Sequence, residues 1–292
     1  MESLPLVLSV FLMGLLPLSV VPTPSPSAVA SLSVVAPAII GTQEFPGQRL
    51  ARSLSASGVV IVDLQSGQEL FARYADTRRS VGSLTKLMTA VIIAESHEMD
   101  EVVTVPKGIE KTDGSTMRLP PGSHFTVGDL LSALLIPSAN DAAETLARYH
   151  SGSREAFVKE MNERAAMLGL RNSSFANPSG LDDTVQWSTP RDIAWLASYA
   201  LRNPELRSRM STAHATIKSA EGDIFTLEHT HALLGKDSMV IAGKTGTTIA
   251  AKQCLFSLVT EHGREYVVVL LGSRERYADM RAVLRILVTL FA

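Results

Sequence analysis

The sequence predicts an α+β fold, with one antiparallel sheet that carries helices on its faces and an all-helical lobe beside it. Segments of strand composition occur on both sides of a long central region. That central region has apolar residues at helical spacing. Strands from distant parts of the chain can then share one sheet, and the helices between them must pack on it or on one another.

The strand signals begin with a hairpin. Gly58–Asp63 and Glu69–Tyr74 are rich in apolar, β-branched and aromatic residues and flank the turn sequence Gln65-Ser66-Gly67. Three later runs also predict strands, namely Met239–Ala242, Cys254–Thr260 and Tyr266–Leu271. A C-terminal helix is expected from about Tyr277.

The central region predicts several helices. Thr85–Ala94 combines good helix formers with an apolar stripe. Thr126–His150 indicates two helices that bracket residues 138–140. Arg154–Leu168 ends at Gly169, and Thr189–Leu201 has proline near its start, where proline is favoured.

Three short motifs follow one another along this framework: Ser83-Leu84-Thr85-Lys86, Ser138-Ala139-Asn140 and Lys244-Thr245-Gly246. Each motif alone is a weak signal, because its residue types are common. Together and in this order they are typical of enzymes whose active-site serine is acylated by an amide or a β-lactam.

The spacing of the first motif suits nucleophilic catalysis. A serine hydroxyl needs a nearby base, and Ser83 and Lys86 lie on one helix face if the segment is helical. Helix N-terminal amides would favour the negative charge that develops there. Lys86 can accept a proton only if burial or a second cation lowers its pKa, and Lys244 could be that cation.

Five segments around the motifs carry a family resemblance: Gly82–Ala90, Leu130–Ala143, Asn177–Asp182, Ser188–Ala194 and Gly243–Thr248. They resemble the low-molecular-mass penicillin-binding proteins, the serine D-alanyl-D-alanine carboxypeptidases and their endopeptidase relatives. The resemblance runs from about residue 57 to the C-terminus. It implies the penicillin-binding/β-lactamase-like transpeptidase fold.

The resemblance also implies catalytic roles. Ser83 would be the nucleophile, Lys86 the general base for acylation, and Ser138 a proton relay towards the leaving group. Asn140 would hold the substrate amide, and Lys244 would support the electrostatics around Ser138.

The third motif would bind substrate. By resemblance, Thr245 and Thr247 border the terminal carboxylate of the substrate, and the backbone amides of Ser83 and Thr247 form an oxyanion hole. Gly246 suits a strand edge that another backbone approaches closely. Arg276, which follows the last predicted strand, is a further candidate for the carboxylate, because arginine forms bidentate pairs; a solvated arginine at a helix start is the alternative.

The sequence departs from the family pattern at two places. Ser80-Val81-Gly82 precedes the nucleophile where the family often has Pro-x-Ala. Ala251-Lys252 stands where many members have Ala-Gly, so the Lys252 side chain could narrow the rim of the site or change its charge.

Composition excludes several other classes. The formal net charge of −2 argues against binding to nucleic acid. The single cysteine, Cys254, cannot form an intramolecular disulfide. His229 and His231 have no nearby cluster of ligands, so we expect no metal, and the resemblance implies no cofactor.

Residues 1–48 differ from the rest and predict an export signal or a membrane anchor. Leu4–Val21 is apolar, a Pro/Ser-rich spacer follows, and the first basic residue is Arg49. Ala28-Val29-Ala30 is a candidate cleavage site, whereas about 18 apolar residues could also just span a bilayer. We therefore expect an extracytoplasmic protein, secreted or anchored, with residues 49–292 as its catalytic domain.

Three functions remain open. The first is hydrolysis of D-Ala-D-Ala stem peptides of peptidoglycan or of its peptide cross-links, with β-lactams as covalent inhibitors. We expect no β-rich domain after the C-terminal helix, which keeps the endopeptidase alternative open. The second, a class A-like β-lactamase, needs a deacylating glutamate, and no Glu-x-x-Leu-Asn sequence lies between Asn140 and Lys244. The third is a penicillin sensor.

Overall fold

A computed structural model describes residues 46–291 of the chain. The predicted export or anchor segment lies almost wholly outside the described residues, so its boundary at residue 48 stays a prediction. Within residues 46–291, no helix combines the length and the apolar character needed to cross a bilayer.

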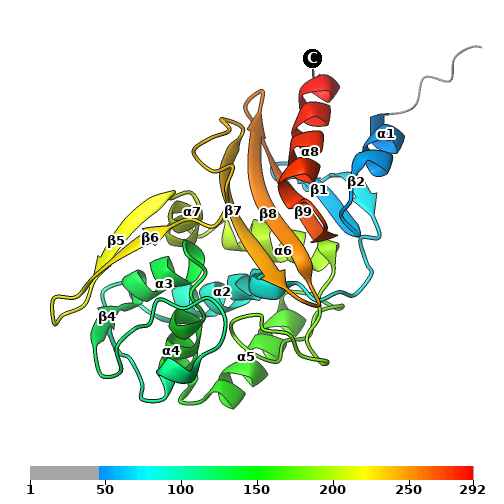
Figure 1. The fold of residues 1–292 in the computed structure, drawn as a ribbon. Helices are drawn as coiled ribbons and strands as arrows, with labels where there is room; N and C mark the ends of the chain where they lie inside the picture. Colours follow the sequence, from blue (N-terminus) through cyan, green and yellow to red (C-terminus); the bar gives the residue numbers. More distant parts are fainter. Residues whose placement is uncertain (1–45, 292) are drawn as a thin grey trace, which may run out of the picture. The chain divides into compact units, whose positions relative to one another are not determined.

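The centre of the fold is a five-stranded antiparallel sheet with strand order β2-β1-β9-β8-β7 (Figure 1). The strands are β1 (Gly58–Asp63), β2 (Glu69–Arg73), β7 (Val240–Thr248), β8 (Lys252–Glu261) and β9 (Arg264–Ser273). Strands from both sides of the helical region thus share one sheet, as the sequence predicted.

Strand β7 is longer than the predicted Met239–Ala242. It continues to Thr248 and therefore contains the whole Lys-Thr-Gly motif. This part has little apolar alternation, and the strand persists because it is paired with β8, for example Lys244 with Phe256 and Gly246 with Cys254. Among residues 46–291, no strand pairs with the other side of β7, so β7 is an edge strand of the described sheet.

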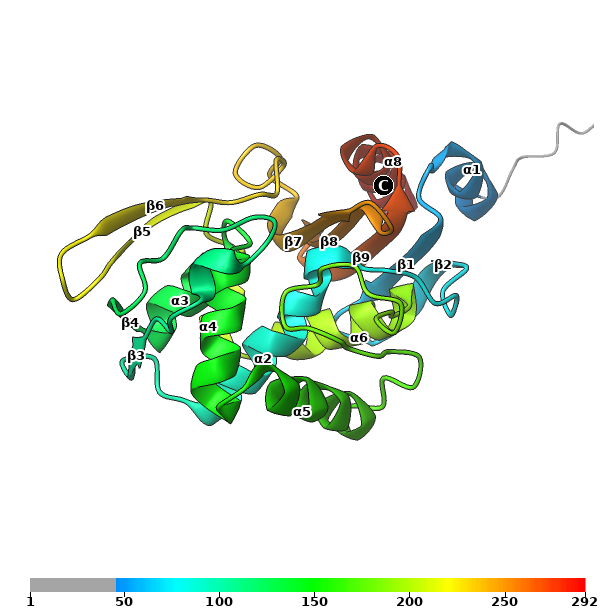
Figure 2. The ribbon, with the colours of Figure 1, turned by 60° about the horizontal axis from the view of Figure 1, so that its bottom comes forward.

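Both faces of the sheet are buried, and successive residues of β9 point to opposite faces. Tyr266, Val268 and Leu270 pack with the helices α1 (Pro46–Ser53) and α8 (Arg276–Phe291). Val267, Val269 and Leu271 belong to the larger core, which includes α2 (Lys86–Ser96) and α6 (Pro190–Ala200) (Figure 2). Each fully buried side chain of this kind contributes about 1.5–3 kcal/mol.

The helical lobe contains α3 (Val127–Leu135), α4 (Asn140–Ser151), α5 (Arg154–Met167) and α7 (Pro204–Met210). The predicted pair of helices around residues 138–140 is confirmed. A capping box between Thr126 and Asp129 starts α3, which fixes where the following turn lies. The predicted helices after Arg154 and Thr189 are also confirmed, each with a side-chain cap at its start.

Several short elements were not predicted from the sequence. They are the ribbons β3 (Val102–Thr104) with β4 (His124–Thr126) and β5 (His214–Lys218) with β6 (Ile224–Glu228), the 3-10 turn η2 (Ile109–Lys111), and the helices α1 and α7. Strands of three residues are too short to show an alternating pattern.

Candidate active site

Ser83 lies in the 3-10 turn η1 (Gly82–Thr85), and Lys86 is the first residue of α2. The sequence predicted that Ser83 lies in the first turn of an α-helix, whereas in the structure it lies in a 3-10 turn directly before that helix. Residues three apart are even more closely aligned in a 3-10 turn than in an α-helix. The Lys86 Nζ atom lies 2.9 Å from Ser83 Oγ.

Lys86 is completely buried and surrounded by acceptors. Besides Ser83, its Nζ donates to Asn140 Oδ1 at 2.6 Å and to the Ser179 carbonyl at 2.6 Å. Burial lowers the pKa of Lys86 well below its usual value, and the charge of Lys244 lowers this pKa further. The carboxylates of Asp141 and Glu144 oppose that effect without reversing it.

The second and third motifs meet at Ser138 and Lys244. Lys244 Nζ, also completely buried, donates to Ser138 Oγ at 2.7 Å and to its neighbour's carbonyl, Thr245 O, at 3.0 Å. Burial, with a smaller effect from Arg276, lowers the pKa of Lys244 to about 7. Ser138 has φ of +67°, a left-handed conformation that is rare outside glycine and frequent at functional sites.

Asn140 begins α4 and connects the second motif to the first. Its Oδ1 accepts from Lys86, and its Nδ2 donates to the Asp113 carbonyl at 2.7 Å. Both ends of the side-chain amide are therefore held in place, which fixes its orientation beside Lys86.

The nucleophile turn lies directly against β7. A Cβ atom on Gly246 would lie 2.6 Å from the Val81 carbonyl and 3.0 Å from Ser83 N, so only glycine fits. We expected another backbone to approach Gly246 closely, and that backbone is the nucleophile turn of the same chain. Conversely, a Cβ on Gly82, which has φ of +56°, would lie 3.1 Å from Thr247 N. The backbone amides of Ser83 and Thr247 are thus brought side by side.

Arg276 lies at the start of α8 and is only 9% exposed, so it is no solvated arginine. Its guanidinium donates to Thr247 Oγ1 and to the carbonyls of Gly246 (3.1 Å) and Cys254 (2.9 Å). Thr245 Oγ1 donates to Thr230 Oγ1 at 2.6 Å. The third motif is therefore held from two sides.

Sequence reasoning did not identify three contributors to this network: the carbonyls of Ser179 and Asp113 and the hydroxyl of Thr230. Backbone carbonyls leave no residue-type signal. The Ser179 segment was noted only for its resemblance and as a possible lining of the site. A Cβ on Gly180 would lie 2.0 Å from the Gly82 carbonyl, so this loop packs directly on the nucleophile turn.

Two other expectations concern positions near the site. Lys252 has φ of +57°, so it occupies a left-handed position where many family members have glycine. The histidines 229 and 231 are buried, and His231 Nε2 lies 2.7 Å from Ser257 Oγ. Among residues 46–291, no group of three or more His, Cys, Asp or Glu side chains is arranged to hold a metal ion.

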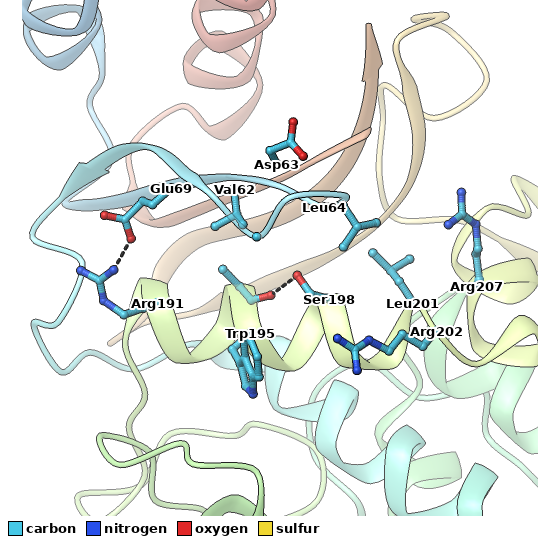
Figure 3. A pocket seen from close by; sticks show the side chains of 12 residues that line it. Val62, Asp63, Leu64, Glu69, Arg191, Trp195, Ser198, Leu201, Arg202 and Arg207 are labelled. Carbon is cyan, nitrogen blue, oxygen red and sulfur yellow. Dashed lines mark hydrogen bonds and ion pairs between the residues drawn. The ribbon is translucent and has the colours of Figure 1, made fainter. Parts of the chain in front are cut away.

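A separate cavity of about 460 Å³ lies between α6 and the β1–β2 hairpin and contains no residue of the three motifs (Figure 3). Two of its three arginines are paired with carboxylates. Arg191 pairs with Glu69 and Asp76, and Arg207 pairs with Glu265. The three motifs instead converge at the junction of the sheet edge and the helical lobe.

Known proteins resemble this chain over most of its length. A curated D-alanyl-D-alanine carboxypeptidase of Streptomyces sp. (strain K15) is 36% identical over 240 residues, which cover 76% of this chain and 82% of that protein. A D-alanyl-D-alanine endopeptidase of Pseudomonas aeruginosa is 30% identical over 263 residues, which cover 88% and 84%.

A solved structure is also similar. The crystal structure of the Streptomyces K15 DD-transpeptidase matches with a TM-score of 0.75 and 33% identity, over 80% of this chain and 96% of that one. Other curated relatives are longer, and the chain spans 61% of the Bacillus subtilis carboxypeptidase DacF and 58% of the Escherichia coli carboxypeptidase DacC.

The model of one protein family, described as D-alanyl-D-alanine carboxypeptidase (Peptidase_S11), matches residues 45–275. This range includes Ser83, Lys86, Ser138, Asn140 and the Lys244-Thr245-Gly246 strand. The chain therefore belongs to the Peptidase_S11 family of serine D-alanyl-D-alanine carboxypeptidases, penicillin-binding proteins with an α+β fold.

Proposed function

We propose that this protein removes the terminal D-alanine from peptidoglycan stem peptides through an acyl-enzyme on Ser83. The observation that carries the proposal is the contact of 2.9 Å between Ser83 Oγ and the Nζ atom of Lys86, a side chain that is completely buried. Burial lowers the pKa of Lys86 and so favours its neutral amine. Its amine then donates to Asn140 and Ser179, and its lone pair faces the serine hydroxyl.

Acylation follows from this arrangement. Ser83 Oγ attacks the carbonyl carbon of the scissile amide while its proton passes to Lys86 Nζ. The carbonyl oxygen becomes negative and is stabilised by the backbone amides of Ser83 and Thr247. Loss of one such donor typically costs about 100- to 1000-fold in kcat.

Release of the leaving group needs a proton on its nitrogen. Ser138 Oγ is placed to give that proton as the C–N bond breaks, and Lys244 Nζ, 2.7 Å away, can replace it. D-alanine leaves, and an ester links the rest of the peptide to Ser83. Lys86 gives up the proton it took from Ser83, and Lys244 regains the one it supplied, by exchange with water. A water molecule then attacks the ester carbonyl with neutral Lys86 as base, and this proton passes to Ser83 Oγ as the ester C–O bond breaks, which regenerates Ser83. We expect slow deacylation of β-lactams, which makes them covalent inhibitors.

The terminal carboxylate of the substrate would lie at the third motif. Lys244 contributes charge, and the hydroxyls of Thr245 and Thr247 can donate hydrogen bonds. Arg276 adds a second cation behind Thr247, to which its guanidinium donates. Hydrogen bonds to charged groups are worth about 1.5–3 kcal/mol each.

Cleavage of peptide cross-links is the second candidate function. It is favoured by the Pseudomonas aeruginosa relative named an endopeptidase, which matches over 88% of this chain. The same residues would serve, because the cross-link is also an amide beside a D-centre.

Incubation with a pentapeptide that ends in D-Ala-D-Ala and with a cross-linked dimer separates the two, with products read by mass spectrometry. We expect release of D-alanine from the pentapeptide, and none with Ser83→Ala. The same variant should lose labelling by a fluorescent penicillin, while tryptic mapping of the wild type finds the label on Ser83. Cleavage of the dimer alone would overturn the carboxypeptidase assignment in favour of the endopeptidase.

We also propose that the protein works outside the cytoplasm, where peptidoglycan lies, and that residues 1–48 direct its export or hold it at the membrane. This leaves residues 49–292 as the catalytic domain. A reporter fused after Gln48 should be exported. A reporter that stays in the cytoplasm would contradict the proposal.

A further inference from the structure

An open pocket of about 640 Å³ adjoins the nucleophile turn, and nothing in the proposed mechanism uses it. Its walls include Arg78 and Ser80 from the segment before Ser83, Asp182 and Trp187 from the loop after Gly180, and Ala250 from the turn after β7.

The loop that forms one wall of the pocket also packs on the nucleophile turn. The loop from Gly180 rests on Gly82, where a Cβ would lie 2.0 Å from the Gly82 carbonyl. Two residues later, Asp182 accepts from Thr248 Oγ1 at 2.5 Å and from Ala250 N at 3.0 Å. One loop therefore supports the nucleophile turn, holds the end of β7 and forms the pocket wall.

The direction of β7 tells which part of a substrate reaches this pocket. The proposed carboxylate site lies at the Lys244 and Thr245 end of the third motif, with the Thr247 hydroxyl at its border, and the oxyanion amide of Thr247 comes two residues after Thr245. A peptide that lies along this edge strand therefore has its C-terminal carboxylate at Thr245 and its scissile carbonyl at Thr247. Its acyl side, N-terminal to the scissile bond, continues past Thr248 towards the pocket.

The available charge in the pocket is that of Arg78. Its guanidinium carbon lies 5.5 Å from the centroid of the Trp187 ring, and its Nη2 donates to Asn172 Oδ1 at 3.2 Å. Among residues 46–291 no carboxylate lies within ion-pair distance of Arg78. By contrast, Arg191 and Arg207 in the cavity of Figure 3 are paired with carboxylates.

The other charged side chains of the pocket are already engaged. Both oxygens of Asp182 accept hydrogen bonds, and Asp183 Oδ1 accepts from Val185 N at 2.9 Å. Arg79 Nη2 donates to the Ser57 carbonyl at 3.3 Å. An exposed cation held against an aromatic face is a suitable partner for a carboxylate, because arginine pairs with it in a fixed plane.

We infer that Arg78 and Trp187 form a subsite for a carboxylate on the acyl side of the peptide substrate. This inference rests on the proposed function, since it assumes that the substrate lies along β7. It adds a determinant of specificity that is separate from the terminal carboxylate.

The test uses the full-length chain and synthetic peptides that end in D-Ala-D-Ala, with either glutamate or glutamine one, two or three residues before that pair. We expect wild-type kcat/KM to be about 5- to 10-fold higher for glutamate at one of these positions, as for a charge-assisted contact that remains partly solvated. Arg78→Gln should abolish this preference, and Arg78→Lys should retain part of it.

Two controls keep the result specific. Arg202→Gln changes an arginine of the other cavity and should keep the preference for glutamate. Arg78→Gln should be acylated by benzylpenicillin at the wild-type rate, which shows an intact nucleophile. Equal cleavage of the glutamate and glutamine peptides by wild type, or equal losses on both with Arg78→Gln, would overturn the subsite. Cleavage of no peptide by wild type would overturn the proposed function and the subsite with it.

Discussion

Lys244 on the edge strand of the sheet donates a hydrogen bond of 2.7 Å to Ser138 in the helical lobe, 106 residues earlier in the chain. This bond joins the second and third motifs. Because Lys244 is completely buried with a pKa of about 7, the proton that it holds is lost near neutral pH.

The pH dependence of peptide cleavage should report Lys244. Below pH 7 the Lys244 ammonium can supply a proton to Ser138 and attract the carboxylate of the substrate. Above pH 7 this positive charge is lost. We therefore expect kcat/KM for the D-Ala-D-Ala pentapeptide to have a descending limb near pH 7. Lys244→Arg keeps the charge at all accessible pH values and should remove that limb, even if the overall rate falls. A limb that persists in Lys244→Arg would assign it to another group.

Lys86→Ala should lower the rate of acylation by a penicillin at least about 100-fold, the low end of what general acid–base catalysis provides. The reason is that no other amine contacts Ser83 Oγ among the described residues. Stopped-flow or gel-based labelling measures the rate. Lys159→Ala on the exposed side of α5 is the control and should react as the wild type does. A Lys86→Ala rate within a few-fold of wild type would show that another group is the base.

Arg276→Ala should impair cleavage of the free-carboxylate pentapeptide much more than acylation by a β-lactam ester. A lost charge-assisted contact of about 1.5–3 kcal/mol corresponds to about 10- to 150-fold in kcat/KM. The ester lacks the carboxylate and should suffer less. Equal losses on both substrates would mean that Arg276 acts by holding Thr247 and the Gly246 carbonyl, to which it is bonded.

Buried histidine should make the protein less stable in acid. Burial is the main cause that lowers the pKa of His231 from 6.5 to about 4, so the folded state binds fewer protons than the unfolded state between these values. The free energy of unfolding therefore falls as the pH drops from 6.5 towards 4, by about 1.4 kcal/mol per pH unit for one such group.

Urea unfolding at several pH values between 4.5 and 6.5 measures this slope. His231→Gln should reduce the slope by about one proton, whatever its effect on stability at pH 7. His214→Gln, which replaces an exposed histidine of β5, is the matched control for the substitution itself. An unchanged slope in His231→Gln would show that His231 does not titrate as its burial implies.

The sequence alone determined the elements that have strong local signals. The apolar, β-branched runs in the segments of β1, β8 and β9 and the proline near the start of α6 act within a few residues, so these strands and this helix were predictable. The order of the three motifs, Ser83 to Lys86, Ser138 to Asn140 and Lys244 to Gly246, also identified the type of chemistry, because nucleophile and base lie one turn apart.

Tertiary structure alone decided what surrounds those groups. The Ser179 carbonyl beside Lys86, the packing of Gly180 on Gly82 and the continuation of β7 through its motif all depend on segments that are distant in sequence. The lowered pKa values of Lys86 and Lys244 have the same origin, because burial is a property of the packed chain rather than of residue type. The sequence identifies Lys86 and Lys244 as candidate groups. Only the packing of the folded chain excludes the water that would otherwise keep these lysines protonated.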